Sequence, residues 1–292
     1  MNEPRPLSPN ELYQRLLESL RTLENALVAF SGGVDSAFLV LAVREAGIPY
    51  LAVTAQSPTM PERDLEDVRK LVQTLDLNHR LIASGEMEDP NFSRNAHDRC
   101  YHCKSDLFGR LTELARQEGY AHVLDGSTLD DGNDYRPGMR AKERFGVSSP
   151  LMEAGLSKNN IRLLSRAKGL ATWDKPASPC LSSRIAYGEP IELESLRKVA
   201  QAENGLRALG FATLRVRKQG DTARIELTEP DIVRLLDGKL RQQVSELVRG
   251  CGFHFVALDL EGFQSGKLNR VIPVAVHSSE SASPAGAASA MP

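Results

Sequence analysis

Cysteine is scarce in this sequence, and long apolar runs are missing. Among 292 residues there are four cysteines and one tryptophan. Four unevenly spaced cysteines are too few for the disulfide framework of a small secreted domain. The longest strongly apolar stretch, 37–43, is much shorter than the ~20 residues that span a bilayer, and residues 1–6 contain no apolar segment typical of a signal peptide. We therefore expect a cytoplasmic protein with no membrane partner.

Neither sign of charge predominates. The chain has 36 basic and 38 acidic side chains, which give a formal charge of -2. A protein that coats nucleic acid needs a broadly basic surface, so we do not expect a nucleic-acid partner. Hydrophobic residues make up 41% and charged residues 25%, as in ordinary folded proteins. At roughly 100 to 200 residues per domain, the length predicts two domains.

Short apolar runs alternate with helical patterns in the first part of the chain. Ser8, Pro9 and Glu11 form a typical helix start, with a cap, a first-turn proline and a capping-box acid. The expected strands are 26–30, 50–54, 80–83 and 122–124, and the expected helices are 9–23, 34–46, 61–75 and 104–118. This alternation is typical of βαβ units, so we predict an α/β fold with a doubly wound parallel sheet.

The second part of the chain has a different pattern. Residues 129–190 mix glycine, proline and serine with charges around one helical stretch, 157–168, and are interpreted as a linker that lines a site. The elements expected after it are a helix over 192–209, a hairpin of 213–217 and 223–227, a helix over 230–249 and a strand over 254–258. We predict domains over 1–188 and 189–277, the second a smaller α+β domain, and a disordered tail over 278–292.

A glycine turn joins the first predicted strand to the next helix. The turn consists of Ser31, Gly32, Gly33, Val34, Asp35 and Ser36. Adjacent glycines let the backbone approach an anion, and the first N–H groups of the helix favour phosphate. No lysine stands at the helix start, so this is not the kinase-type loop. Asp35 stands there instead and would repel polyphosphate unless a cation intervenes, which predicts ATP with Mg²⁺. The simpler alternative is a capped helix after a glycine turn.

The cysteines offer three interpretations. They are Cys100, Cys103, Cys180 and Cys251. The first two are three positions apart and could form a redox dithiol, a zinc site completed by Cys180 and His97 or His102, or an iron–sulfur site with Cys180 as third ligand. Structural zinc needs four ligands, whereas a four-iron cluster held by three cysteines leaves one iron open to an external sulfide. Cys251 adjoins an apolar strand and is interpreted as a small buried hydrophobe.

Two segments resemble known families. The turn resembles the S-G-G-x-D-S motif of the PP-loop ATP pyrophosphatases, which have a doubly wound α/β domain and split ATP into a bound adenylate and pyrophosphate. Segment 175–188, with Pro-Ala-Ser-x-Cys-Leu-Ser-Ser-Arg-Ile-x-Tyr-Gly, is similar to the LarE family of ATP-dependent sulfur transferases. The LarE resemblance also covers 125–131, Asp134, Arg136, Pro137, Gly138 and the strand with Arg215 and Arg217.

The LarE resemblance implies a reaction. Members adenylate a carboxylate of pyridinium-3,5-biscarboxylic acid mononucleotide and convert it to a thiocarboxylate for the nickel-pincer nucleotide cofactor of lactate racemase. In lone-cysteine members, the residue at the position of Cys180 gives up its own sulfur. Cys100 and Cys103 depart from that pattern and resemble a subgroup in which three cysteines hold a four-iron four-sulfur cluster that carries the sulfide. The resemblance thus implies Cys180 and Asp35 as catalytic residues, a sulfide source and a homo-oligomer.

Several polar residues are candidates for the substrate nucleotide. Ser183, Arg184, Arg215 and Arg217 are predicted to hold its phosphate by charge-assisted hydrogen bonds. The alternative for each arginine is an exposed position on a sheet. Asp125, Asp130, Asp131 and Asp134 suit Mg²⁺ or ribose, or only a turn. Glu226, Glu229 and Asp231 suit a second metal or a helix start, and Trp173 suits a stacked base or the domain junction.

Two rival functions use the same residues. A PP-loop tRNA thiolase would use the same glycine turn and a similar cluster, but it needs a basic surface, which the balanced charge argues against. A non-catalytic adenine-nucleotide sensor would bind nucleotide at the turn and structural zinc at the cysteines. Analysis of anaerobically purified protein for iron and acid-labile sulfide separates the cluster from zinc.

Overall fold

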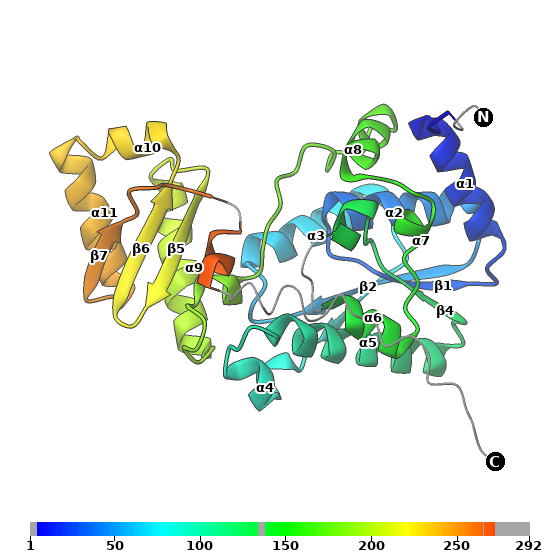
Figure 1. The fold of residues 1–292 in the computed structure, drawn as a ribbon, viewed down its shortest axis with the longest axis horizontal. Coiled ribbons are helices and arrows are strands. Elements are labelled where there is room, and N and C mark those ends of the chain that lie inside the picture. The colour runs from blue at the N-terminus through cyan, green and yellow to red at the C-terminus, as the bar shows by residue number, and fades with distance from the viewer. Residues whose placement is uncertain (1–4, 134–137, 265, 272–292) are drawn as a thin grey trace, which may run out of the picture.

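The strands form two separate sheets (Figure 1) in a computed structural model of the chain, which describes residues 5–133, 138–264 and 266–271. The first sheet has the order β3-β2-β1-β4, and all its neighbouring strands are parallel. The second has the order β5-β6-β7, antiparallel between β5 and β6 and parallel between β6 and β7. The predicted α/β class with a parallel sheet and a smaller second sheet is confirmed.

Helices and strands alternate in the first part of the chain, and most bounds match the prediction closely. The strands are β1 (Ala26–Ala29), β2 (Tyr50–Gln56), β3 (His79–Ala83) and β4 (His122–Leu124). The helices are α1 (Pro9–Arg21), α2 (Val34–Ala46), α3 (Glu62–Leu75), α4 (Pro90–Ser93), α5 (Arg99–Glu118), α6 (Gly138–Phe145), α7 (Pro150–Glu153) and α8 (Lys158–Ala167). The capping box of α1 forms as expected, with Ser8 and Glu11 each accepting a backbone N–H of the other. Local sequence therefore determines this helix start.

Helices cover both faces of the first sheet (Figure 1). Successive residues of β1 point to opposite faces, so Val28 packs in the apolar cluster of α1 and α2, while Leu27 packs in the cluster of α5 and α6. Both side chains are fully buried. A strand buried on both faces reads as a continuous apolar run, which is what the sequence of β1 shows.

The strand order places a ligand crevice at the end of β1. From β1 the chain moves to β2 and β3 on one side and returns to β4 on the other. In open parallel sheets, ligands bind at the carboxyl ends of the strands at such a switch point. The segments that follow β1 and β4 therefore meet there.

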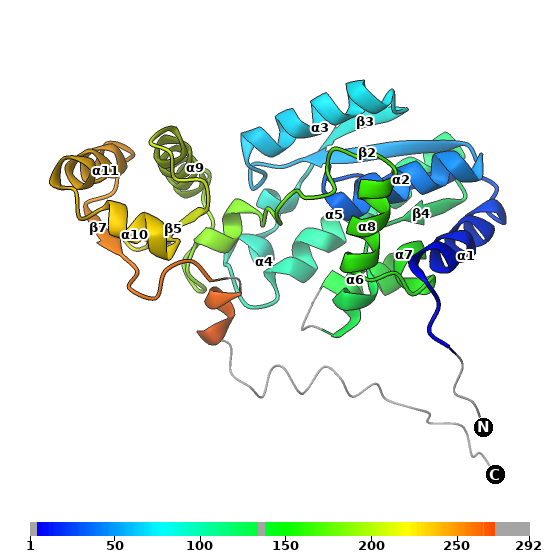
Figure 2. The same cartoon turned by 90° about the horizontal axis from the view of Figure 1, so that it is seen from above.

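The second sheet has its own apolar core. Its elements are α9 (Leu193–Ala208), β5 (Leu214–Gln219), β6 (Thr222–Leu227), α10 (Glu229–Arg234), α11 (Gly238–Gly250) and β7 (Phe255–Leu258). Helices α9 and α11 lie on one side of the sheet (Figure 2) and share its core. Leu181 and Ile185 also pack in this core, and Ile185 pairs with Lys218 of β5. The domain boundaries stay predictions.

Three expectations about secondary structure were wrong. Helix α5 begins at Arg99 and not near Lys104, so it includes Cys100 and Cys103. The single helix expected over 230–249 is two helices, because the Asp237 side chain caps a new helix by accepting the N–H of Lys239. The region 129–190 contains α6, α7 and α8 and is more helical than a linker.

In the part of the chain that the structure describes, no helix is long and apolar enough to cross a membrane.

Candidate active site

The glycine turn after β1 is held in shape by its own serines. The hydroxyl of Ser36 accepts the N–H of Ser31 at 3.2 Å and donates to the carbonyl of Gly33 at 3.3 Å. Gly32 has a φ of 68°, in the left-handed region that favours glycine. Gly33 then caps α2 without a side-chain hydrogen bond, so the first N–H groups of α2 keep the anion-binding capacity predicted for them.

The two glycines give a matched pair of variants. A Cβ on Gly32 would lie 2.6 Å from Cγ2 of Val68 at a φ that strains any other residue, so we expect Gly32→Ala to lower the free energy of unfolding by about 1–3 kcal/mol. A Cβ on Gly33 meets only the Ser31 hydroxyl, at 3.4 Å. We expect Gly33→Ala to fold normally and to weaken ATP binding, because the added methyl lies in the anion site. Urea denaturation and calorimetric ATP titration check both results, and equal stability of the two variants would contradict the prediction.

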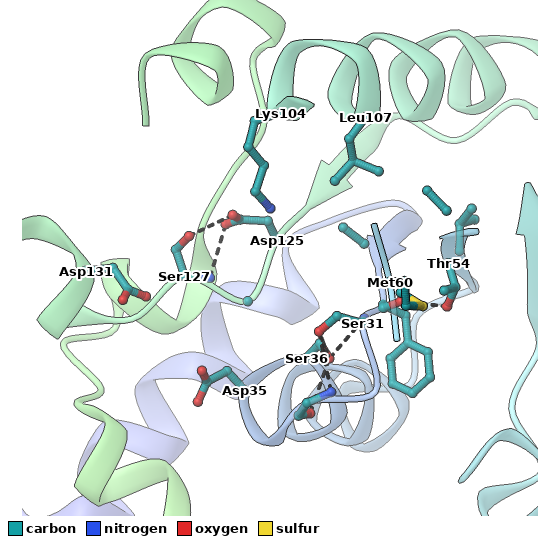
Figure 3. A pocket seen from close by; sticks show the side chains of 16 residues that line it. Ser31, Asp35, Ser36, Thr54, Met60, Lys104, Leu107, Asp125, Ser127 and Asp131 are labelled. Atoms are coloured by element: carbon teal, nitrogen blue, oxygen red, sulfur yellow. Dashed lines mark hydrogen bonds between the residues drawn. The ribbon is translucent and has the colours of Figure 1, made fainter. Parts of the chain in front are cut away.

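A cavity of about 410 Å³ opens beside this turn, between the carboxyl ends of β1, β2 and β4 (Figure 3). Its lining includes the apolar side chains of Val53, Met60 and Leu107. The polar and charged residues that line it are Ser31, Ser36, Asp35, Asp125, Ser127, Asp131 and Lys104. Lys104 extends from α5 toward Asp125 in Figure 3. A pocket with apolar side chains and a phosphate-binding backbone suits a nucleoside polyphosphate.

Asp35 lies in this cavity with its charge poorly compensated. Burial raises the pKa of Asp35 to about 6, against a lowering effect of the Lys158 ammonium, and the Asp131 carboxylate raises it further. Asp35 and Asp131 line the same cavity (Figure 3). Two carboxylates beside a phosphate site suit Mg²⁺, which takes one or two carboxylates together with phosphate oxygens and water. The donors present thus fit the predicted ion.

The segment after β4 is fixed against the glycine turn. Asp125 accepts the hydroxyls of Ser127 at 2.7 Å and Ser149 at 2.6 Å, and the buried Lys142 donates to Ser149 at 2.7 Å. Gly126 packs so closely that a Cβ there would lie 3.1 Å from the backbone N of Ser36. The turn-only interpretation is therefore insufficient for Asp125. Asp134, Arg136 and Pro137 lie outside the described residues.

Cys180 lies beside the same turn, although it is far away in sequence. A second cavity, of about 350 Å³, shares Ser31, Gly33 and Asp35 with the first and is also lined by Cys180. The backbone N–H of Leu181 donates to the carbonyl of Thr59 at 2.7 Å, which holds this segment against the loop after β2. A thiol is thus placed at the site where the sequence predicts adenylate formation.

Cys100 and Cys103 occupy the first turn of α5. Burial raises the pKa of both thiols, and the Cys180 thiol raises each further, so the three cysteines share one electrostatic environment. Cys100 and Cys180 are nevertheless exposed to solvent. These three thiols are the cluster ligands that the sequence predicts.

The histidines do not complete a zinc site. His102 faces the carboxylates of Asp89 at 3.3 Å and Asp98 at 3.4 Å, while the ring of His97 packs on Tyr187 with centroids 4.7 Å apart. Among the described residues, no three His, Cys, Asp or Glu side chains converge closely enough for one metal ion. The geometry of the described residues therefore supports neither a four-ligand zinc site nor convergence of Cys100, Cys103 and Cys180 on one metal ion, and the cluster stays a prediction.

Two of the predicted phosphate-binding arginines form buried ion pairs. Nε and Nη2 of Arg217 donate to Glu226 at 2.9 and 3.0 Å, and Nε of Arg184 donates to Glu203 at 2.9 Å. Arg217 is 2% exposed, so the alternative of an exposed sheet residue is wrong for it. Glu226 belongs to β6 and pairs with Arg217, so it is neither at a helix start nor in a metal site formed by described residues.

Arg215 lies on the same face of the sheet but has no carboxylate partner among the described residues. Its Nη1 donates to the carbonyl of Gln264 at 3.3 Å, and its guanidinium lies 4.7 Å from the Phe263 ring centroid. Burial lowers the pKa of Arg215, and the nearby Arg217 and Arg184 lower it further. An anion would relieve this repulsion, so Arg215 suits the predicted phosphate role better than Arg184 or Arg217 does.

Three further candidates make local contacts that explain them without a ligand. Glu229 and Asp231 stand in the first turn of α10, and Asp231 accepts the Thr228 hydroxyl at 2.8 Å, which confirms the helix-start interpretation. Trp173 lies under the Arg166 guanidinium at 4.9 Å and lines neither of these two cavities, so stacking on a base has no support there.

Sequence reasoning missed four cationic residues of the site. They are Lys104 in the first cavity and Lys158, Arg162 and Lys175 in the second. Lys158 and Arg162 are four positions apart on α8 and so lie on one face of it, a spacing that the sequence displays. Nothing in the sequence shows which neighbour that face meets.

Comparison with known proteins locates the chain in a family. It is 37% identical over 256 residues to pyridinium-3,5-bisthiocarboxylic acid mononucleotide synthase of Lactiplantibacillus plantarum, covering 87% of this chain and 92% of that protein. The chain belongs to the LarE family. An uncharacterized protein of Synechocystis sp. is 44% identical over 266 residues, covering 89% of this chain and 99% of that protein.

Other comparisons add little to the LarE assignment. No family model matches the chain. The solved structure of NMN synthetase from Francisella tularensis aligns with a TM-score of 0.46 and 19% identity, over 59% of this chain and 76% of that chain. This similarity is too low for an inference about function from that structure.

Proposed function

We propose that this LarE-family protein adenylates a carboxylate of pyridinium-3,5-biscarboxylic acid mononucleotide and converts it to a thiocarboxylate for nickel-pincer nucleotide synthesis. The observation that carries the proposal is the position of Cys180, which lines a cavity together with Ser31, Gly33 and Asp35 of the glycine turn. A thiol beside a phosphate-binding turn brings sulfur chemistry to an adenylation site. The name of the Lactiplantibacillus plantarum relative supplies the substrate class.

The first step is adenylation. A carboxylate oxygen of the substrate attacks the α-phosphorus of ATP, the bond to the β-phosphate breaks, and pyrophosphate leaves with the bonding electrons. The N-terminus of α2 and the cations around the cavity stabilise the developing charge. Asp35 and Asp131, which line the cavity, would hold Mg²⁺, and the ion would neutralise the phosphates. Adenylation is required because oxide is a poor leaving group, whereas AMP leaves readily.

The second step introduces sulfur. Sulfide adds to the acyl carbon of the adenylate, and AMP departs with the electrons of the broken carbon–oxygen bond. Cys100, Cys103 and Cys180 would hold a four-iron four-sulfur cluster, whose open iron supplies the sulfide when the cluster is bound. The solvent exposure of Cys100 and Cys180 leaves room for a sulfide source to reach the thiols.

We place the phosphate of the substrate nucleotide at Arg215 on the second sheet. Arg215 has donors left for an anion, and we place Ser183, Arg184 and Arg217 around it as supporting residues. Arg184 and Arg217 would have only a supporting role, because Glu203 and Glu226 accept their hydrogen bonds and balance their charge.

Variants of Arg217 and Arg215 distinguish an effect on stability from an effect on substrate binding. Arg217→Gln leaves Glu226 buried with only Arg224, 3.6 Å away, so we expect it to lower the free energy of unfolding by about 3–5 kcal/mol. Arg215→Gln breaks no ion pair among the described residues and should raise the KM for the pyridinium nucleotide while ATP affinity stays unchanged. Denaturation curves and steady-state kinetics check both results. A stable Arg217→Gln protein would show that the pair contributes little.

One assay tests the proposed function. Anaerobically reconstituted protein is incubated with ATP, Mg²⁺, sulfide and the pyridinium dicarboxylate nucleotide, and products are identified by mass spectrometry together with pyrophosphate release. We expect replacement of a carboxylate oxygen by sulfur with formation of pyrophosphate and AMP, and no product without ATP. Pyrophosphate release that depends on tRNA, with no thiolated nucleotide, would overturn the proposal.

A further inference from the structure

Residues 175–180 end at the thiol of Cys180 and have no helix or strand of their own. We call them the thiol segment. Positions 176 and 179 are prolines, which carry no N–H, and in the described part of the chain the N–H groups of 177, 178 and 180 reach no backbone carbonyl. A segment without backbone hydrogen bonds of its own depends on neighbouring elements for its position. The contacts that hold this segment therefore decide where the thiol lies.

Two arginines hold the ends of the thiol segment. Nη1 and Nη2 of Arg162 donate to the carbonyls of Trp173 and Lys175 at 2.8 and 2.9 Å. At the other end, Nη1 of Arg184 donates to the carbonyl of Pro179 at 2.8 Å. Each arginine fixes the path of the chain near one end of the segment, and the middle of the segment is left to a different contact.

The middle of the thiol segment is held by a buried carboxylate. The Ser178 hydroxyl donates to Oδ2 of Asp64 at 2.5 Å. Asp64 stands in the first turn of α3 and is 8% exposed, whereas Ser178 is on the surface. The ion pair of Asp64 with Arg63 is long, at 3.7 Å. Hydrogen bonds to a carboxylate are roughly twice as strong as those between neutral groups, so this contact ties the segment to α3.

The bond to Asp64 also limits how far the thiol can move. Ser178 precedes Cys180 by two positions, which an extended chain spans in about 7 Å. One position after Cys180, the N–H of Leu181 donates to the carbonyl of Thr59 at 2.7 Å. Thr59 and Asp64 both belong to the short stretch 59–64, so this stretch holds the chain on both sides of the thiol. Asp64, Ser178 and Cys180 line the second cavity together with the glycine turn.

We propose that Asp64 is a positioning residue for the sulfur step: through Ser178 it holds the Cys180 thiol beside the glycine turn, where the acyl adenylate forms. The inference rests on the proposed function. The same placement is needed whether Cys180 binds a cluster or gives up its own sulfur. Because Asp64 acts through Ser178 and the thiol, it affects the transfer of sulfur and not the adenylation that precedes it. A shift of about 1 Å at a reacting group can slow a reaction about 100-fold.

The first test compares variants of the two bonded residues. Asp64→Ala and Ser178→Ala remove the hydrogen bond, whereas Asp64→Asn keeps an acceptor oxygen and Ser178→Thr keeps a hydroxyl. Glu66→Gln is the matched control, because Glu66 is exposed on α3 and lines neither cavity at the glycine turn. We expect thiolation to slow about tenfold in both alanine variants, with the KM for ATP and first-turnover pyrophosphate release unchanged. The conservative variants and the control should react at the wild-type rate.

Two further measurements show whether the pair acts as a unit. The double variant Asp64→Ala/Ser178→Ala should thiolate no more slowly than either single variant, because one bond is lost in each case. The second measurement needs no thiolation. In the full chain purified without reconstitution, ATP with Mg²⁺ should protect Cys180 from iodoacetamide, because the thiol and the glycine turn share one cavity. We expect this protection, measured by mass spectrometry, to fall about tenfold in the alanine variants only.

Two results would overturn the positioning role. One is thiolation and protection at the wild-type level in both alanine variants. The other is loss of ATP affinity in Asp64→Asn, which would place the carboxylate in the nucleotide or Mg²⁺ site. Ser178→Ala serves if Asp64→Ala unfolds, because Ser178 is on the surface. The proposed function is tested separately. Lost protection in a protein that never thiolates supports the positioning role and removes the function, whereas thiolation with rate and protection unchanged in the variants does the reverse.

Discussion

Replacement of Asp35 with Asn is expected to abolish ATP-dependent pyrophosphate release while it makes the folded protein more stable above pH 6. The amide keeps the shape of the carboxylate but cannot hold Mg²⁺ against the phosphates, so the α-phosphorus is not activated. Glu45→Gln, at the other end of α2, is the control and should retain pyrophosphate release. Unchanged release in Asp35→Asn would remove this carboxylate from the mechanism.

The stability effect follows from the raised pKa of Asp35. Its pKa is about 6 in the folded protein and 3.8 in an ordinary environment. Between these values the folded protein binds more protons than the unfolded chain, so the free energy of unfolding decreases as the pH rises through this range. The penalty is complete above about pH 6. Asp35→Asn removes it, and we expect a gain of about 1–3 kcal/mol at pH 8 and almost none at pH 4. Urea denaturation at both pH values measures the difference.

Replacement of Cys100 or Cys103 with Ala is expected to eliminate cluster absorbance, iron content and multiple turnover. Each change leaves two of the three thiolate ligands, which is too few to retain a cluster of this kind. Cys251→Ala is the matched control. Cys251 packs against the apolar core of the second sheet, as the sequence indicated, and it does not line either cavity at the glycine turn. The control should keep iron, sulfide and turnover.

The cysteine prediction has two contradicting results. Zinc without iron or acid-labile sulfide in anaerobically purified wild type would end the cluster hypothesis. Single-turnover thiolation in Cys100→Ala at the wild-type level would show that Cys180 gives up its own sulfur. Measurement of iron and sulfide in the wild type is the first experiment to perform.

Features whose chemistry is local were predictable from the sequence. The glycine turn carries its function in six consecutive residues, because strand, turn and helix start follow directly from apolar pattern, glycine and serine. The start of α1 was predictable for the same reason. The start of α5 was not, because Arg99 and Cys100 extend the helix in a polar region where the apolar period is interrupted.

Features that depend on long-range contacts were not predictable. The sequence places Arg215 and Arg217 on one face of a strand, and the strand register puts Glu226 opposite Arg215. The Glu226 carboxylate nevertheless forms its ion pair with Arg217, which only the side-chain positions in the fold show. The hydrogen bonds of Arg162 to the carbonyls of Trp173 and Lys175 likewise depend on the path of the chain after α8. A single sequence records which cations exist, whereas the fold decides which of them acquire partners.

Arg162 holds the segment before Cys180 by two hydrogen bonds, and this affects which sequence changes the segment can tolerate. Its two bonds go to main-chain carbonyls, which every residue provides, so the side chain at position 173 is free to drift among related proteins without loosening the anchor. The number of residues between this anchor and Cys180 cannot vary in the same way. Deletion of one residue between 176 and 179 would leave the hydrogen bonds of Arg162 in place but move the Cys180 thiol away from the glycine turn. We therefore expect related proteins to differ here by substitutions and not by changes in length.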